Sequence, residues 1–203
     1  MPYEYTFYDT NNRPIVQCDL ECTQCKGITR AGNQCSRNTC IGVGFCWHHL
    51  MSVKHLKIKN SNLHGKGLFA FLNKRATQRD IVFRSGEEII IYDGKIVDSK
   101  VIHNSYRDYT APYAVKIYGV PKVKDAACKR GIAAIANTHN NPEMRNARII
   151  TKVTPRTLRR SVVLVATKDI FHGQEIINDY GHEYNLPEDE NTTFKTRYVQ
   201  RKN

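Results

Sequence analysis

Short β-like segments dominate the chain between residues 55 and 184. Each runs for a few residues rich in Ile, Val and Tyr, and turn-forming or charged residues bound it. The segments are HLKIKNS, GLFAFL, EEIIIYDGKIV, YAVKIYGV, RNARIITKV and SVVLVATKDI. Helical periodicity is weak, and it predicts helices over residues 125–137 and 193–202. The pattern therefore predicts a mainly β fold with a few short helices.

Six of the seven cysteines fall between Cys18 and Cys46, and the seventh is Cys128. No apolar run approaches the roughly 18 residues of a membrane span, and no secretory signal precedes the cysteines. We therefore expect no membrane association and a location in the nucleus or cytoplasm, or in the host nucleus if the protein is viral. In a reducing compartment such cysteines favour metal binding or reactive thiols over disulfides. The clustering predicts a small module over residues 1–50, a main domain over 54–184 and a tail over 185–203.

The cysteine-rich segment contains a set of soft ligands with the spacing Cys25-x9-Cys35-x10-Cys46-x2-His49. Three thiolates and one imidazole close the tetrahedron that Zn²⁺ prefers. The stretch from residue 24 to 49 also resembles a small zinc motif that ends in Cys-Trp-x-His. The spare donors Cys18, Cys22, Cys40 and His48 remain alternative ligands. The sequence thus predicts a structural zinc site, with one or two ions.

The net charge of +12 suggests a polyanionic partner. Residues 1–50 carry four basic and four acidic side chains, so the excess lies after residue 50. We expect contact with DNA or a nucleosome, or else a generally basic solvated surface. The candidate basic residues are Arg156, Arg159, Arg160, Lys195, Arg197, Arg201 and Lys202.

Four motifs follow one another in a fixed order. They begin with Leu63-His64-Gly65-Lys66-Gly67-Leu68-Phe69-Ala70, Gly86-Glu87-Glu88-Ile89, Lys124-Asp125-Ala126-Ala127, and Ala166-Thr167-Lys168-Asp169-Ile170 followed by Gly173-Gln174-Glu175-Ile176. The third continues to Ala136-Asn137-Thr138-His139, and the fourth to Asn178-Asp179-Tyr180. Together, across about 130 residues, they resemble the SET family of protein lysine methyltransferases.

The resemblance implies a SET-type β-clip with a pseudoknot, joined to the zinc-binding N-terminal module. It also implies S-adenosylmethionine as cofactor and Zn²⁺ in the module. The residues implied in cofactor binding are Gly65, Lys66, Gly67, Leu68, Asn137, Thr138 and Tyr180. Tyr180 is in addition the implied catalytic residue, because it matches the tyrosine beside the transferred methyl. The tail would close the cofactor site.

Aromatic residues outside these motifs are candidates for the remaining walls of the site. Tyr106, Tyr109 and Tyr113 lie in the region that lines the substrate channel in the family, or else they pack in the core. Phe194 and Tyr198 either cover the adenine ring or dock the tail on the sheet.

The sequence departs from the family pattern at three places. Thr138 stands where the family has His, and His139 follows one position late. Asn178 occupies a position that in the family influences how many methyl groups are added. No cysteine follows Cys128, so the zinc-binding segment that follows many SET domains is absent. These departures bear on cofactor affinity and on the product.

The function implied is transfer of a methyl group from S-adenosylmethionine to a lysine of a protein substrate, which is a histone or another lysine-bearing protein. A basic enzyme repels a basic histone tail unless DNA or acidic residues bring the two together. The second hypothesis is a non-catalytic SET-like module that binds nucleic acid or chromatin through zinc and basic surface. Cofactor binding distinguishes the two hypotheses.

Overall fold

The fold is mainly β with a few short helices, as the sequence predicts. The computed structural model describes residues 3–8, 14–20, 22–39, 44–106, 113–129, 131–180 and 195–200. Within these residues the helices are α1 (Trp47–Lys54), α2 (Ser99–Tyr106) and the 3₁₀ turns η1 (Ile132–Ile135) and η2 (Pro142–Met144). The first strands are β1 (Tyr3–Tyr8), β2 (Pro14–Leu20), β3 (Thr23–Gln24), β4 (Asn38–Thr39), β5 (Leu56–Asn60), β6 (Lys66–Ala70), β7 (Ile81–Phe83) and β8 (Glu88–Ile91). The others are β9 (Lys95–Asp98), β10 (Ala114–Ile117), β11 (Lys122–Asp125), β12 (Ala147–Val153), β13 (Arg160–Ala166), β14 (Ile170–Phe171), β15 (Asn178–Asp179) and β16 (Lys195–Gln200).

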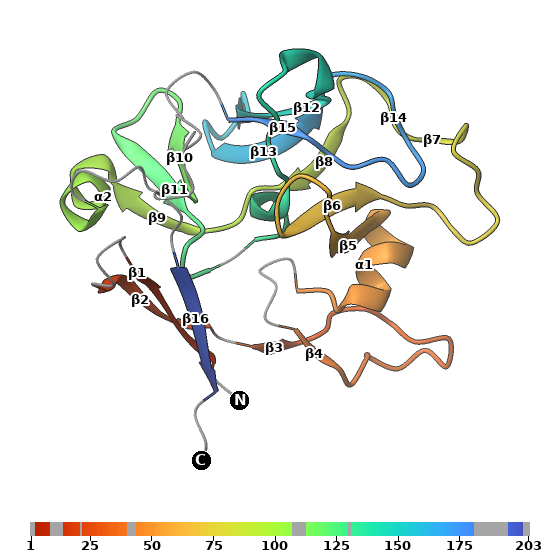
Figure 1. Ribbon diagram of the computed structural model, residues 1–203, viewed down its shortest axis with the longest axis horizontal. Coiled ribbons are helices and arrows are strands. Elements are labelled where there is room, and N and C mark those ends of the chain that lie inside the picture. Colours follow the sequence, from red (N-terminus) through yellow and green to blue (C-terminus); the bar gives the residue numbers. More distant parts are fainter. Residues whose placement is uncertain are drawn as a thin grey trace.

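The main core lies on a four-stranded sheet with the order β15-β12-β13-β8. Strand β13 is buried at every position from Val162 to Ala166, so both of its faces are covered. Such a continuous apolar run needs packing on both sides, unlike the alternating pattern of a half-exposed strand. Three smaller sheets, β9–β11, β5–β6 and β7–β14, surround this one (Figure 1).

The segment from Gly173 to Asp179 ties the β5–β6 hairpin to the central sheet. The Ile176 N–H donates to the Leu68 carbonyl at 2.7 Å, and Glu175 forms a bridge with Phe69. The chain then continues as β15, which runs parallel to β12. The Asn178 N–H also donates to the Asn137 carbonyl at 2.7 Å. The third and fourth sequence motifs therefore meet here, while the pseudoknot itself stays a prediction.

The helix predicted over residues 125–137 is wrong. Strand β11 extends to Asp125, and only the 3₁₀ turn η1 follows. Gly131 explains the interruption, because a Cβ at this position would lie 2.9 Å from the Asp93 backbone. That close approach holds the chain against the strand end and leaves no room for a continuous helix.

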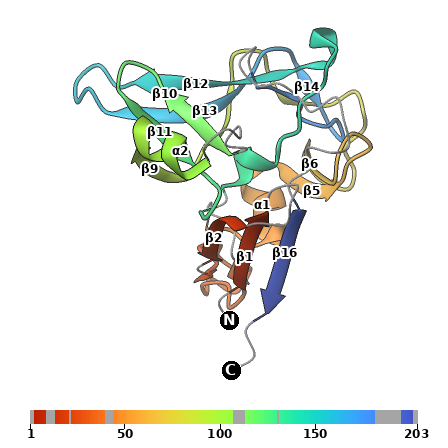
Figure 2. The same ribbon diagram turned by 60° about the vertical axis from the view of Figure 1, so that its left-hand side comes forward.

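The tail helix predicted over residues 193–202 is also wrong. Residues Lys195–Gln200 form β16, which pairs antiparallel with β1 and completes the sheet β16-β1-β2. This pairing provides hydrogen-bond partners for the backbone N–H and C=O groups along one edge of β1, which would otherwise be unpaired. The first and last strands of the chain therefore lie side by side, apart from the central sheet (Figure 2).

The cysteine-rich segment sits between this terminal sheet and the β5–β6 hairpin (Figure 1). It contains the short pair β3–β4 and ends in α1, which packs against β5. Helix α1 runs across residue 50, where the sequence predicts the module to end. No helix in the described ranges is long and apolar enough to cross a bilayer.

Candidate functional site

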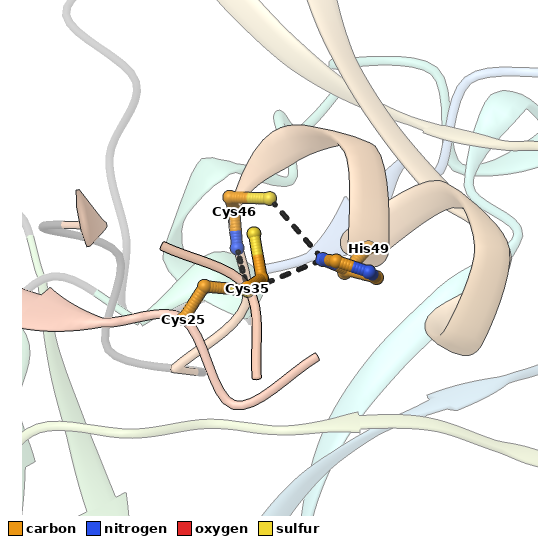
Figure 3. Close-up of side chains that lie close together, drawn as sticks. All are labelled: Cys25, Cys35, Cys46 and His49. Atoms are coloured by element: carbon orange, nitrogen blue, oxygen red, sulfur yellow. Dashed lines mark hydrogen bonds between the residues drawn. The ribbon is translucent and has the colours of Figure 1, made fainter. Parts of the chain in front are cut away.

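Three cysteines and one histidine converge in the interior of the N-terminal segment (Figure 3). They are Cys25, Cys35, Cys46 and His49, the ligand set that the sequence spacing favours. Their sulfur and nitrogen atoms all lie within 4.8 Å of one another. All four side chains are buried, with exposed fractions of 0%, 6%, 3% and 9%.

The distances in this cluster fit a tetrahedral metal ion. His49 Nδ1 lies 3.4 Å from Cys25 Sγ and 3.5 Å from Cys46 Sγ. With ordinary Zn–S and Zn–N bond lengths, a tetrahedron places such atoms about 3.6 Å apart. The donor set therefore fits Zn²⁺.

The surrounding groups orient the ligands. His49 Nε2 lies 3.1 Å from the Ile28 carbonyl oxygen, which accepts a hydrogen bond, so Nδ1 is left to face the three thiols and any ion held among them. The backbone N–H groups of Gly27 and Cys46 donate to Cys25 Sγ at 3.3 and 3.1 Å. A Cβ at Gly27 would fall on the His49 ring, so glycine is required there. These contacts prepare the cluster to hold an ion.

The two cysteines with shifted pKa values respond to these contacts in opposite directions. Burial raises the pKa of Cys46, but hydrogen bonds from His49, Cys25 and His48 outweigh it and lower the pKa to about 6. Cys46 also precedes α1, and a helix N-terminus favours a thiolate. For Cys35, an Arg37 backbone hydrogen bond lowers the pKa, but burial and the neighbouring thiols raise it by more.

Cys22 and Cys128 are disulfide-bonded. The expectation that the cysteines form no disulfides is therefore wrong for these two, and Cys22 is not a spare metal ligand in this structure. Oxidation of both sulfurs removes the thiolate that a metal needs. Of the three remaining spare donors, His48 is exposed on α1, whereas Cys18 and Cys40 lie outside the described side chains.

A second site forms where the turn before β6 meets Asn137. The Asn137 side-chain amide Nδ2 lies 3.1 Å from the His64 carbonyl, 3.2 Å from the Lys66 carbonyl and 2.9 Å from Glu175 Oε1. The first and third sequence motifs, separated by some seventy residues, are therefore in direct contact. The order of the motifs along the chain does not reveal this contact.

The turn itself has the conformation that its glycines permit. Gly65 has a φ of +47°, in the left-handed region, and a Cβ there would meet no atom within 4 Å. Gly67, in contrast, is buried, and a Cβ would collide with the Glu175 carboxylate. The backbone of the turn is therefore accessible at Gly65, whereas at Gly67 the Glu175 carboxylate packs directly against it. Lys66 is exposed and Leu68 is fully buried in the core.

Tyr180 reaches the same region from the last motif. Its hydroxyl donates to the Ala136 carbonyl at 2.8 Å, one residue before Asn137. Thr138 is half-buried beside Asn137. The residues implied in cofactor binding therefore gather in one place, from three separate segments.

The predicted channel tyrosines are described only in part. Tyr113 is half-buried, packs against the main core, and its carbonyl accepts a hydrogen bond from Tyr92 Oη at 2.9 Å. Tyr106 ends α2, and its side chain lies outside the described part, as do Tyr109, Phe194 and the side chain of Tyr198. The role of these residues as channel or cover stays a prediction.

Glu175 has no role predicted from the sequence, although it lies within the fourth motif. Its Oε2 accepts from Ser61 Oγ at 2.9 Å, while its Oε1 accepts from Asn137. Ser61 in turn holds the turn, since its N–H donates to the Gly65 carbonyl at 3.0 Å. Glu175 is therefore the anchor between the glycine turn and Asn137.

Two buried asparagines also belong to this region. Asn146, 3% exposed, donates from Nδ2 to the Glu175 carbonyl at 2.9 Å and accepts from the Ile177 N–H at 2.8 Å. Asn178 is 1% exposed, and its Oδ1 has no hydrogen-bond partner among the described residues. In an extended chain, residues two apart point to the same side, so Asn178 and Tyr180 face the same way.

Comparison with known proteins gives similarity at the level of solved structures. No protein-family model matches the chain, and no curated protein matches its sequence. The chain is similar to ATXR5 in complex with a mono-methylated histone H3.1, with 20% identity, a TM-score of 0.48, and coverage of 64% of this chain and 60% of that one.

A second similar structure is ctPRC2 in an autoinhibited conformation bound to S-adenosylmethionine. Its identity is 20% and its TM-score 0.48, with coverage of 66% of this chain and 16% of that one. The matched part of this chain therefore spans less than two thirds of either structure. Because the identity and the TM-score are low, neither structure carries an argument about the function of this chain.

Proposed function

We propose that the protein transfers a methyl group from S-adenosylmethionine to a lysine side chain of a protein substrate, a histone or another lysine-bearing protein. The observation that carries the proposal is the meeting of the Gly65 turn, Asn137 and Tyr180 at one site. These are the residues that the resemblance to SET methyltransferases implies. They come from three distant segments of the chain, which the fold brings into contact.

The site fits the cofactor in two respects. The left-handed turn at Gly65 leaves open space where a side chain would stand, so backbone groups are accessible to the polar end of a ligand. The half-buried Asn137 and Thr138 offer polar atoms beside it. When bound, S-adenosylmethionine supplies an electrophilic methyl group on a positively charged sulfur.

The protein's own contribution is orientation. Methyl transfer needs a neutral amine aimed at the methyl carbon, and fixed geometry provides much of the acceleration. The Tyr180 hydroxyl is held by the Ala136 carbonyl, which fixes its oxygen beside the Asn137 segment. An oxygen fixed in this way stabilises partial positive charge and positions the amine. Enclosure of the lysine away from water lowers its pKa and favours the neutral form.

The zinc module has a structural role in this proposal. Its four donors are buried and close together, and a single ion bound by all four would have a complete tetrahedron. Catalytic zinc sites keep an open position for water or substrate, which a set of four protein ligands does not. We therefore assign the ion to stabilising the segment from residue 22 to α1.

The second candidate function is that of a SET-like module that binds chromatin or nucleic acid without transferring methyl groups. Thr138 favours it, because the family's histidine is missing at this position. Cofactor binding decides between the two, since a pure binding module needs no S-adenosylmethionine.

The test is incubation of the protein with isotopically labelled S-adenosylmethionine and nucleosomes, free histones or a cell extract. We expect label on lysine, and we expect Tyr180→Phe to reduce the rate by about 100-fold or more while leaving the fold intact. Calorimetry with S-adenosylmethionine accompanies the assay. Absence of both label and cofactor binding would overturn the methyltransferase proposal in favour of the binding module.

A further inference from the structure

The positive charge of the protein is concentrated in one continuous stretch, residues 22–79. This stretch holds ten of the 31 Lys and Arg residues and none of the 19 Asp and Glu residues. It therefore accounts for +10 of the net charge of +12. It includes the metal cluster, α1, the β5–β6 hairpin and the loop that follows (orange to yellow in Figure 1).

The basic side chains of this stretch face solvent. All are exposed except Lys54, which is half-buried. The ion pairs among the described residues join Lys129 to Asp93, Arg145 to Asp179 and Lys152 to Glu88, and none involves this stretch. The full set is Lys26, Arg30, Arg37, Lys54, Lys57, Lys59, Lys66, Lys74, Arg75 and Arg79. We call it the basic surface.

Aromatic rings support four of these cations. Lys54 Nζ lies 5.7 Å from the centre of the Phe45 ring, and Lys57 Nζ lies 5.3 Å from that of Phe71. Lys59 Nζ lies 4.0 Å from the centre of the Phe69 ring, and the Arg37 guanidinium lies 5.3 Å from that of Trp47. Contacts of this length hold a cation in place without neutralising it. The charges are thus positioned for an external anion.

We infer that the basic surface binds the phosphate backbone of double-stranded DNA, with the lysines at the end of α1 and along β5 at its centre. Lys57 and Lys59 lie on the same side of β5, opposite the buried Leu56. Two residues of a strand advance about 6.7 Å, which is close to twice the 3.4 Å rise per phosphate of one DNA strand. The strand thus offers charges at a spacing that matches the polymer.

The arrangement favours a duplex over other anions. The charges are spread over a helix end, two strands and two loops, which suits a polyanion more than one small anion. Single-stranded nucleic acids bind largely by stacking bases on open aromatic faces. Here each of the four rings already has a cation over it, so contact with phosphate is favoured over stacking.

The test measures the anisotropy of a labelled DNA duplex of two helical turns over a range of salt concentrations. The variant carries Lys54→Gln, Lys57→Gln and Lys59→Gln. The matched control carries Arg156→Gln, Arg159→Gln and Arg160→Gln, three of the residues that the sequence alone offers for DNA contact. They remove the same charge in the β12–β13 turn and at the start of β13, on the other side of the molecule in Figure 2. We expect the first variant to bind the duplex about 10-fold or more weakly. The slope of log affinity against log salt concentration should become shallower by about 2.7, because three phosphate contacts are lost. We expect the control to lose about 2-fold or less.

Zinc content and circular dichroism check that the variants are folded. If the first variant does not fold, Lys74→Gln, Arg75→Gln and Arg79→Gln test the same surface from the loop. Equal losses in variant and control, or absence of duplex binding, would overturn the inference. So would tighter binding to single-stranded RNA or to vesicles rich in phosphatidylserine. Methylation of a free peptide is measured in parallel, so failure of DNA binding and failure of the proposed enzyme activity are separate results.

Discussion

Asn137 and Glu175 are joined by a hydrogen bond of 2.9 Å between the side-chain amide and the carboxylate. The same carboxylate accepts from Ser61, and the same amide donates to the carbonyls on either side of Gly65. The pair therefore fixes the glycine turn against the Asn137 segment. Its geometry decides whether the open backbone at Gly65 stays in position for a ligand.

We expect Glu175→Ala to lower the free energy of unfolding by about 1–3 kcal/mol, because two donors lose their acceptor. S-adenosylmethionine affinity, measured by calorimetry, should fall by about 10-fold or more, because the glycine turn is no longer held in place. A tenfold loss corresponds to about 1.4 kcal/mol of binding free energy. Glu175→Gln keeps one acceptor oxygen and is the matched control, with a smaller loss. Unchanged cofactor affinity in Glu175→Ala would show that the anchor does not position the binding site.

Asn178 provides a test in which two substitutions act in opposite directions. Its buried Oδ1 lacks a partner among the described residues, so Asn178→Leu, of similar size, should be neutral or raise the free energy of unfolding by up to about 1 kcal/mol. Asn178→Asp places a charge in the same buried position and should destabilise the protein. Chemical denaturation measures both. If Asn178→Leu lowers the free energy of unfolding as much as Asn178→Asp does, the Asn178 Oδ1 accepts a hydrogen bond in solution and the prediction is wrong.

Zinc binding should release more protons in acid than at neutral pH. Metal binding requires the thiolate, and the pKa of Cys46 is lowered to about 6. Above about pH 6 Cys46 is already deprotonated, whereas below it one further proton must leave for each ion bound. The affinity for zinc should therefore fall more steeply as the pH drops below about 6. Titration calorimetry in buffers of different ionisation enthalpy counts these protons, and an equal count at both pH values would contradict the assignment.

The two classes of cysteine should differ in their reactivity. Cys22 and Cys128 are disulfide-bonded, so an alkylating reagent should modify them only after reduction. Cys25, Cys35 and Cys46 should be protected by zinc and become reactive when a chelator removes it. Mass spectrometry of peptides after each treatment identifies the modified residues. Alkylation of Cys128 without reductant would show that its disulfide is absent in solution.

Local patterns in the sequence predict much of this protein. Short runs of Ile, Val and Tyr between turn residues indicate a mainly β fold, and strand β13 shows why: its apolar run is buried on both faces. The spacing of Cys25, Cys35, Cys46 and His49 indicates the cluster, because the Cys46–His49 pair needs only one helical turn. In both cases the information lies within a few residues of each element.

The two wrong helix predictions show what local sequence patterns do not determine. Residues 195–200 contain the strand-favouring Thr196, Tyr198 and Val199, but so short a signal is weak, and their pairing with β1 decides between strand and helix. Likewise, the spacing of apolar residues after Asp125 indicates a helix. The contact of Gly131 with the Asp93 backbone, which that spacing does not reveal, prevents it. Contacts between distant segments override weak local preference.

The sequence by itself determined the mainly β character, the four residues of the Cys/His cluster and the motifs of the candidate site. Only the tertiary structure decided that Glu175 joins Asn137 to the Gly65 turn, that Cys22 and Cys128 are oxidised, and that the basic surface carries no ion pair among the described residues. The physical reason is the range of the interactions. Periodicity and ligand spacing act between near neighbours in the chain, whereas these hydrogen bonds, disulfides and ion pairs depend on which distant segments the fold brings together.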